Sequence, residues 1–347
     1  MSDGVKKENK SRQNKKQMVL LASANSKELC KQLHTDKIKN VYRLIMEKYL
    51  KGNIKNKNDY SDTSGKAYVY SIRIWDGVFI SANCIYKEEI IHKGFSKYDM
   101  IFINCCLDGR CEVHFPDDSY GYVEKGMLSI DTMLPKEGYF YPGKKYEGFE
   151  FVIIPELANC PLNDFGLGEK TLEAFIVNGK GFMGNMSETL MSLCEKLYKL
   201  ILDDNTALED LRFYTLEFLS MIKNGEIKKH ISKRYVTKGQ RHIANATEKM
   251  ITKDLSEHIN ISSIAKSMGL ADSTVKKYFE AVYGVTISEY LKNRRMALAE
   301  KLLSESKESV GSIAGMCGYI NQAKFGAVFK AHTGSTPLEY RRLKKII

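Results

Sequence analysis

The last third of the chain repeats itself, and this repeat constrains the fold more than any other feature. The apolar segment at residues 264–269, IAKSMG, returns at residues 313–318 as IAGMCG. Three further positions recur downstream in the same order, namely Phe279, Gly284 and Tyr290 as Phe329, Gly334 and Tyr340. A period of about 50 residues indicates two copies of one small structural unit. Each copy joins a short apolar helix, a turn at glycine and a more polar helix, which is the pattern of a helix-turn-helix.

In the first copy, Asn260 or Ser262 can cap a helix that ends near Met268. Gly269 then stands where the backbone needs a positive φ. The spacing predicts the second helix over residues 272 to about 282, with Val275 and Phe279 facing inward. Side chains that can reach phosphates or base edges lie on or near its outward side. They are Ser273, Thr274, Lys276 and Lys277.

In the second copy, the corresponding helix is predicted over residues 321–332, with Asn321 as its N-cap. Gln322, Ala323 and Lys324 are placed toward its outer side, and Gly326 weakens the helix by about 1 kcal/mol relative to Ala. Between the copies, residues 287–303 predict a helix of roughly 25 Å. Such a spacer could hold two units near one turn of DNA, roughly 34 Å. The alternative is a helical bundle whose repeat is purely structural.

The net charge of +11 is distributed unevenly along the chain. Residues 238–347 carry +8 and residues 1–60 carry +9, which leaves −6 for residues 61–237. A basic C-terminal region suits a polyanion, because each neutralised phosphate releases counterions. A charge run can also be a solvated face and nothing more.

The sequence predicts an α+β multidomain protein with four regions. Residues 1–60 form a basic segment, disordered over about residues 1–17 and helical in spacing over 26–51. Residues 52–66 have the polar composition of a linker. Residues 61–165 contain many short strand-like runs, which predict a β-sandwich or small barrel. Asp108 and Gly109 predict a hairpin between two of these runs, and residues 116–119 predict a second turn.

Residues 166–237 predict two amphipathic helices on either side of a break at residues 203–205, followed by a basic linker over residues 224–238. Their apolar faces fit either a dimer surface or the core of the same domain. The fourth region, residues 238–347, is the all-α repeat.

The repeat resembles the AraC/XylS family of bacterial transcription regulators over about 105 residues. The family signature occurs in order as Ile313-Ala314, Gly318-Tyr319, Phe325, Phe329-Lys330 and the run from Gly334 to Arg341, with Arg295, Ala299 and Leu302-Leu303 in the linker helix. This resemblance implies a regulator that binds double-stranded DNA and, if it is an activator, also RNA polymerase. It places the base contacts on Ser273, Thr274, Lys276 and Lys277 and then on Gln322, Ala323 and Lys324.

Three residues depart from the family pattern. Ala271 stands where the family commonly has Ser, and Gly326 and Ala327 stand where it commonly has Ser/Thr-Arg. We therefore expect the second helix to contact mainly phosphates and to read shape.

The β-rich region is similar to the cupin-like sensor domain of many family members, which implies an unknown small-molecule effector and a possible homodimer. A regulator whose middle domain only dimerises is a second possibility. A metal-dependent cupin enzyme fused to a DNA-binding module is the alternative from another class.

Two motifs suggest other chemistry but are interpreted here as structural. Residues 179–184, GKGFMG, match the dinucleotide-binding glycine pattern, yet no βαβ unit follows them. Cys105, Cys106, Cys111 and His114 are close in sequence, but strand alternation turns neighbouring members to opposite faces. With His92 and Glu112 added, the histidines are still too few for a metal-holding cupin. We expect no metal, no cofactor and no catalytic residue, and hence no enzyme.

The eight cysteines form no Cys-x-x-Cys pair, which is typical of reduced thiols in a cytoplasmic protein. There is no stretch of about 18 apolar residues, so we expect no membrane helix. The N-terminus lacks the apolar core of a signal peptide.

Overall fold

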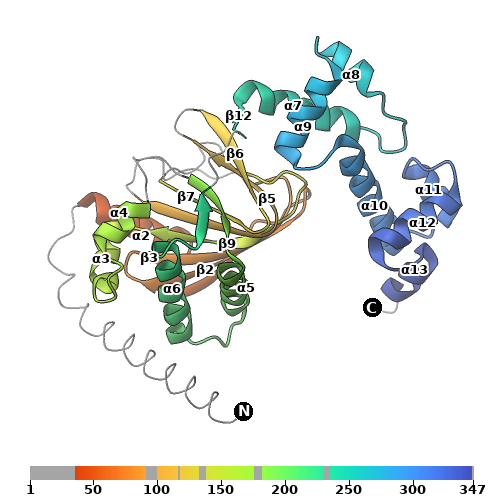
Figure 1. Cartoon of the computed structure of the whole chain (residues 1–347). Helices are drawn as coiled ribbons and strands as arrows, with labels where there is room; N and C mark the ends of the chain where they lie inside the picture. The colour runs from red at the N-terminus through yellow and green to blue at the C-terminus, as the bar shows by residue number, and fades with distance from the viewer. Residues whose placement is uncertain are drawn as a thin grey trace, which may run out of the picture. The chain divides into compact units, whose positions relative to one another are not determined.

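The computed structural model describes residues 36–90, 100–115, 118–132, 138–175, 182–229 and 235–345. The chain divides into two compact units, with the division between Tyr235 and Val236 (Figure 1). The first unit is rich in sheet and the second is helical, as the sequence predicts. Among the described residues, no helix is both long enough and apolar enough to cross a membrane.

The first unit is built on an antiparallel sheet whose strands pair in the order β1-β2-β3-β9-β5-β7-β10-β11, with β6 pairing with β5. Its strands are β1 (Lys55–Asp59), β2 (Lys66–Trp75), β3 (Val78–Tyr86), β5 (Ile101–His114), β6 (Ser119–Glu124), β7 (Met127–Asp131), β9 (Tyr146–Ile153), β10 (Phe182–Met186) and β11 (Ile227–Lys229). A separate pair consists of β4 (Glu89–Ile90) and β8 (Tyr139–Phe140). The helices of this unit are α2 (Asp36–Lys48), α3 (Pro155–Asn163), α4 (Glu169–Phe175), α5 (Glu188–Leu202) and α6 (Leu208–Lys223).

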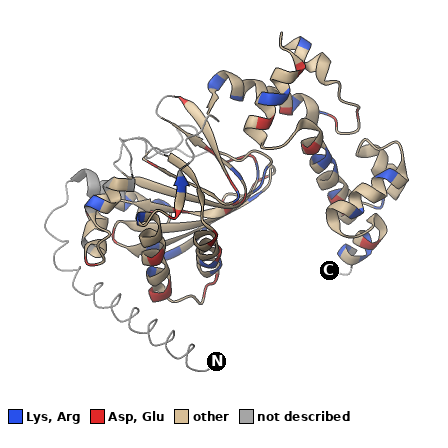
Figure 2. Ribbon diagram, in the orientation of Figure 1, with Lys and Arg blue, Asp and Glu red and all other residues tan. Residues whose placement is uncertain are grey.

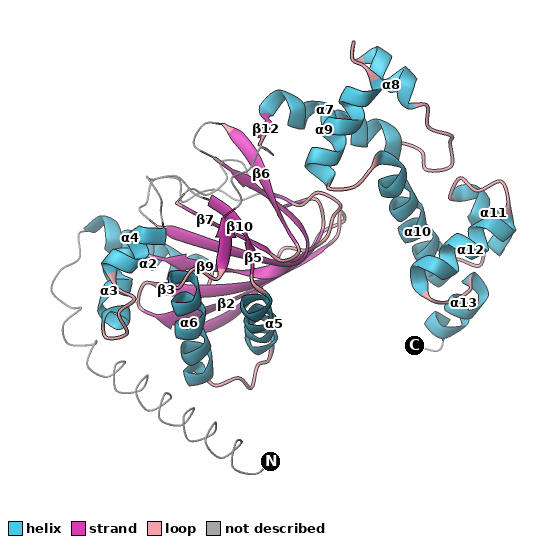
Figure 3. Cartoon of the chain, in the orientation of Figure 1, coloured by secondary structure: helices cyan, strands magenta, loops and turns pink. Residues whose placement is uncertain are grey.

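Helices α5 and α6 lie along one face of the sheet (Figure 3). Their buried faces join one apolar core with β9, in which Phe218 stacks on Phe151 at 5.0 Å between ring centroids. Leu190 and Leu197 of α5 are fully buried in the same core. The sequence allows the apolar faces of these helices to form either a dimer surface or the core of the same domain. In the structure they are buried in the core of their own domain.

The hairpin predicted at Asp108 and Gly109 is wrong. These residues lie inside the single strand β5, where the register with β9 shifts between Cys106 and Asp108. Gly109 has φ +79°, and a Cβ there would lie 2.0 Å from the Lys145 carbonyl oxygen. The glycine therefore serves a bulge that bends one long strand, because neighbouring strands on both sides continue the pairing.

The linker predicted over residues 52–66 is also wrong in part, because it contains strand β1. Residues Lys55–Asp59 pair with β2 at the edge of the sheet, which explains their polar composition. The preceding helix α2 contributes Ile45 to a cluster that includes Phe79 and Phe102. This part of the basic N-terminal segment is therefore packed on the sheet.

The dinucleotide-like glycine pattern leads into a strand. Gly184 lies in β10, which pairs with β7 and β11, so the helix that a phosphate-binding turn requires does not begin there. Several predictions fall outside the described residues: the disorder of residues 1–17, the metal candidate His92, the first half of the pattern at residues 179–181 and the turn residues 116–117.

The second unit begins with the short strand β12 (Val236–Thr237) and continues as helices. They are α7 (Lys238–Thr252), α8 (Ile261–Ser267), α9 (Asp272–Tyr283), α10 (Ile287–Glu305), α11 (Val310–Met316), α12 (Gln322–Thr333) and α13 (Pro337–Lys345). Asn260 caps α8 and Asn321 caps α12, each accepting a hydrogen bond from a backbone N–H three residues on. Gly269 and Gly318, in the two turns, have φ of +67° and +74°. The local signals in the sequence predict these helices well.

Gly326 gives a test of this helical packing. A Cβ at this position meets no atom within 4 Å. Replacing Gly326 with Ala should therefore raise the free energy of unfolding by about 0.5–1 kcal/mol, since Ala restricts the unfolded chain and favours helix. Denaturant unfolding followed by circular dichroism measures the change. The comparison variant is Gly318→Ala, which should be less stable than the parent, because its Cβ would lie 2.6 Å from the Leu255 carbonyl oxygen. Equal effects of the two substitutions would contradict this account.

Candidate nucleic-acid interface

The two halves of the repeat are built from the same contacts. The rings of Phe279 and Tyr290 meet edge to face at 5.3 Å and 80°, and those of Phe329 and Tyr340 at 5.4 Å and 86°. Both tyrosine hydroxyls donate to a glutamate over 2.9 Å, Tyr290 to Glu248 and Tyr340 to Glu300. In each half the tyrosine therefore packs its ring on the second helix and donates a hydrogen bond to the helix that precedes the half.

Helix α10 is shared between the two halves. Its first part carries Tyr290, which packs in the first half, and its last part carries Glu300, which holds the second half. Glu300 thus has the role in the second half that Glu248 of α7 has in the first. The sequence predicts this helix as a spacer, whereas in the structure it packs as part of both halves of the repeat.

Helix α9 turns its polar residues outward. Val275 and Phe279 are fully buried, while Ser273, Lys276 and Lys277 are exposed and Thr274 is half-buried. The Ser262 hydroxyl donates to Asp272 over 2.5 Å, which joins the first turn of α8 to the first turn of α9. The four candidate residues are therefore presented on a helix whose start is fixed by its partner.

Helix α12, like α9, buries its apolar side chains and exposes its other face, but the exposed side chains are of different types. Gln322, Ala323 and Lys324 are exposed, and Phe325 and Phe329 are fully buried. Ile320, just before the N-cap, is as exposed as in an isolated peptide, with 108% relative accessibility. Sequence reasoning missed this residue. The available signal was its position: it stands between the turn glycine and the cap, outside the buried spacing of either helix.

Arg295 of α10 joins the two halves. Its Nε donates to the Leu255 carbonyl over 3.0 Å and its Nη2 donates to the Glu257 carbonyl over 2.8 Å, both in the loop between α7 and α8. On the side of the second half, its guanidinium lies against Gly318 and 5.9 Å from the ring centroid of Tyr319. One side chain therefore connects a loop of the first half to the turn of the second.

The surface of the second unit carries Lys and Arg along its helices, including α9 and α10 (Figure 2). Its excess of positive charge suits a polyanionic partner such as nucleic acid, because Lys and Arg that neutralise phosphates release counterions.

Residues 264–343 match the family model described as a helix-turn-helix domain. The chain is 36% identical over 85 residues to the probable transcription factor PqrA of Proteus vulgaris, covering 24% of this chain and 70% of that protein. It is 31% identical over 91 residues to the regulatory protein SoxS of Salmonella typhimurium, covering 26% of this chain and 85% of that protein. It is also 33% identical over 91 residues to the transcriptional activator RhaR of Mannheimia succiniciproducens, covering 26% of this chain and 33% of that protein.

The chain belongs to the AraC/XylS family of transcription regulators. In this AraC/XylS regulator the matched residues run from α8 to α13 and contain all seven candidate contact residues. The match spans most of PqrA and SoxS but only a third of RhaR.

The cysteines in the first unit of the AraC/XylS regulator do not gather at one site. Cys105 lies in the core under α5 and α6, whereas Cys106 and Cys111 lie in a separate cluster. Burial raises the pKa of all three thiols. Within the described ranges, no three His, Cys, Asp or Glu side chains are placed to hold one ion.

Arg295 provides a stability test for the family module. Replacing it with Ala removes two charge-assisted hydrogen bonds to carbonyls of the loop between α7 and α8, one part-buried and one exposed, and should cost about 1–3 kcal/mol. Calorimetric unfolding of the full chain measures this loss. Lys292→Ala, at an exposed position of the same helix, should change the free energy of unfolding by less than about 0.5 kcal/mol. An Arg295→Ala protein as stable as Lys292→Ala would exclude the joining role.

Proposed function

We propose that this chain regulates transcription by binding specific sites in double-stranded DNA, with α9 and α12 entering successive major grooves. The observation that carries the proposal is the duplicated unit with two outward-facing helices on one shared helix. Two such units can read half-sites about one helical turn apart, roughly 34 Å. RNA polymerase becomes a further partner if the protein is an activator.

On α9, Lys276 and Lys277 are assigned to guanine O6 and N7 or to phosphate, since both are exposed. Ser273 and Thr274 stand one turn earlier and are assigned to phosphate or base edges. On α12, Gln322 has the amide that pairs with adenine, and Lys324 is assigned to phosphate. The small Ala323 allows close approach to the duplex.

Ile320 adds an apolar contact to this assignment. Thymine is the base that presents a methyl group in the major groove, and an exposed aliphatic side chain is its natural partner. The second helix would then combine phosphate contacts with one apolar contact to a base. This extends the expectation that α12 contacts mainly phosphates and shape.

The first unit is proposed to sense a small-molecule effector. It contains a lined cavity, described below, which supports effector binding over a purely dimerising role. Dimerisation through this unit remains a proposal. If the first unit were instead a metal-dependent cupin enzyme, purified protein would contain stoichiometric iron, zinc or manganese, which elemental analysis measures.

The primary test is selection of duplexes from a random pool by the full chain. We expect recovery of a defined site and an affinity that falls with salt, because several phosphates are neutralised. Recovery of no preferred sequence at any salt concentration would reject sequence-specific binding.

Lys276 is the sharpest single substitution. Lys276→Ala should weaken binding to the selected site by about 1–3 kcal/mol, either by losing a guanine contact or by losing a phosphate contact. Titration at several salt concentrations separates the two, since loss of a phosphate contact lowers the salt slope by about one. Lys199→Ala, an exposed lysine on α5 of the first unit, is the control for net charge. If both variants lose the same affinity, the assignment of Lys276 fails.

Ile320 is tested by specificity. Ile320→Ala should lower the preference for thymine over cytosine at one position of the site, because an aliphatic contact with its methyl group is lost. The loss should be about 1 kcal/mol. Leu343→Ala on α13, another exposed apolar residue, is the control. Unchanged base preference at every position in Ile320→Ala would remove this residue from the interface.

A further inference from the structure

A row of polar residues crosses the sheet of the first unit at one level. Ser71 of β2 lies opposite Ser81 of β3, Ser81 lies opposite Glu150 of β9, and Glu150 lies opposite Asn104 of β5. Directly opposed residues share one face of a sheet. We call Ser71, Ser81, Glu150 and Asn104 the polar row.

The polar row faces away from helices α5 and α6. Phe149 and Phe151, on either side of Glu150 along β9, are buried in the core under those helices. Because side chains alternate along a strand, Glu150 points to the other face. A carboxyl group thus occupies a central position of the sheet, on a face where an apolar residue would complete a core.

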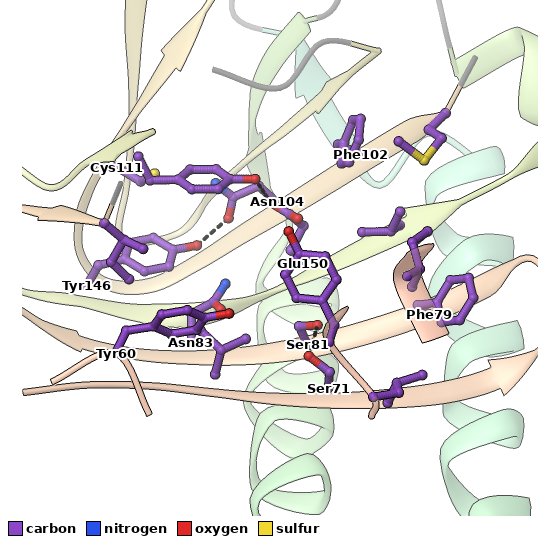
Figure 4. A pocket seen from close by; sticks show the side chains of 18 of the residues that line it. Tyr60, Ser71, Phe79, Ser81, Asn83, Phe102, Asn104, Cys111, Tyr146 and Glu150 are labelled. Carbon is purple, nitrogen blue, oxygen red and sulfur yellow. Dashed lines mark hydrogen bonds between the residues drawn. The ribbon is translucent and has the colours of Figure 1, made fainter. Parts of the chain in front are cut away.

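The polar row lines a cavity of about 100 Å³. Aromatic rings form much of its wall, including Tyr49, Tyr60, Phe102, Tyr139, Tyr141 and Tyr146. Figure 4 shows Asn104, Glu150 and Tyr146 around the same space, with Tyr146 hydrogen-bonded to Asn104 and Ser81 to Ser71.

The charge of the cavity is set by Glu150. No Lys, Arg or His is found among the described residues of its wall, and Glu150 is the carboxyl group there. Its Oε2 accepts a hydrogen bond from the Tyr139 hydroxyl over 3.3 Å. Burial raises the pKa of Glu150 to about 7, against the lowering effect of that hydrogen bond.

The other titratable side chains on the described wall of the cavity stay neutral near pH 7. Burial raises the pKa of every other titratable side chain there: Tyr49, Tyr60, Tyr139, Tyr141, Tyr146 and Cys111. Glu150 is therefore the group whose charge changes near neutral pH on this part of the wall.

We propose that this cavity binds a small organic cation, an amine with an apolar body whose ammonium group lies against Glu150. A buried carboxylate with no cationic partner among the described residues of the wall is unfavourable, and an ammonium group removes that cost. Aromatic faces attract cations, and the apolar wall receives the rest of the ligand. The same carboxylate repels anions. This inference rests on the proposed sensing function of the first unit and names the class of its effector.

The proposal fixes the sign of the pH dependence. Below a pKa of about 7 the Glu150 carboxyl is protonated, so affinity for an amine should fall as the pH is lowered from 8 to 6. In the ligand-free protein the raised pKa has the opposite consequence. The stability associated with protonated Glu150 is present at low pH and is lost as the pH rises through the pKa.

The test uses three probes with one skeleton, 2-phenylethylamine, 2-phenylethanol and phenylacetate, added to the full chain at millimolar concentration. Thermal unfolding and calorimetric titration at pH 8 report binding. We expect the amine to raise the melting temperature most and phenylacetate to have no effect. Glu150→Gln should bind the amine at least about tenfold more weakly and lose the pH dependence. Glu156→Gln, an exposed residue of α3, should behave as the parent.

A structural role for Glu150 predicts a different result, because Glu150→Gln would then destabilise the ligand-free protein at pH 8. Under the proposal, this variant is at least as stable as the parent at that pH and unchanged in its affinity for the selected duplex. Equal or tighter binding of phenylacetate, no stabilisation by the amine, or full amine affinity in Glu150→Gln would each overturn the inference. Duplex selection by the ligand-free chain is scored separately, so a failure of the cation proposal is distinguishable from a failure of DNA recognition.

Discussion

The geometry of the second unit depends on the two hydrogen bonds that Arg295 donates to the carbonyls of Leu255 and Glu257. A helix-turn-helix positions only its own second helix, so two of them need a link that fixes their separation. Helix α10 supplies the length of the link, and Arg295 ties it to the loop before the first half. Gly318 leaves the space for the guanidinium, since a side chain at that position would collide with it. Lys could not replace this arrangement, because a single ammonium group lacks the planar fork of donors.

The helices of the second unit could be predicted from sequence because their signals are local. An asparagine cap at Asn321 and a turn glycine at Gly318 act within a few residues of the helix that they define. The strands of the first unit were harder, because strand pairing is decided by distant residues. Asp108 and Gly109 carry a hairpin signal, but β9 continues alongside them and turns the same dipeptide into a bulge. β1 is polar because it lies at an edge, so composition alone resembles a linker.

The same distinction separates the two candidate sites. The outward positions of Ser273, Lys276 and Gln322 follow from helical periodicity, so the sequence could propose them. Ile320 escaped because apolar residues are normally assigned to cores. The polar row escaped for a deeper reason. Ser81, Glu150 and Asn104 lie far apart in sequence, and only the register of three strands brings them to one level.

Glu150 links the packing of the first unit to its chemistry. On one face of β9, Phe149 and Phe151 are surrounded by α5 and α6 and fill the core. On the other face, an aliphatic residue at position 150 would increase buried apolar area and remove a desolvated carboxyl. The aromatic wall instead leaves a cavity beside this carboxyl, with the Tyr139 hydroxyl donating a hydrogen bond to it. Since packing alone favours closing such a space, the arrangement is explained by an occupant whose charge and shape compensate for it. The stability of the fold therefore favours a cationic occupant as much as the composition of the cavity does.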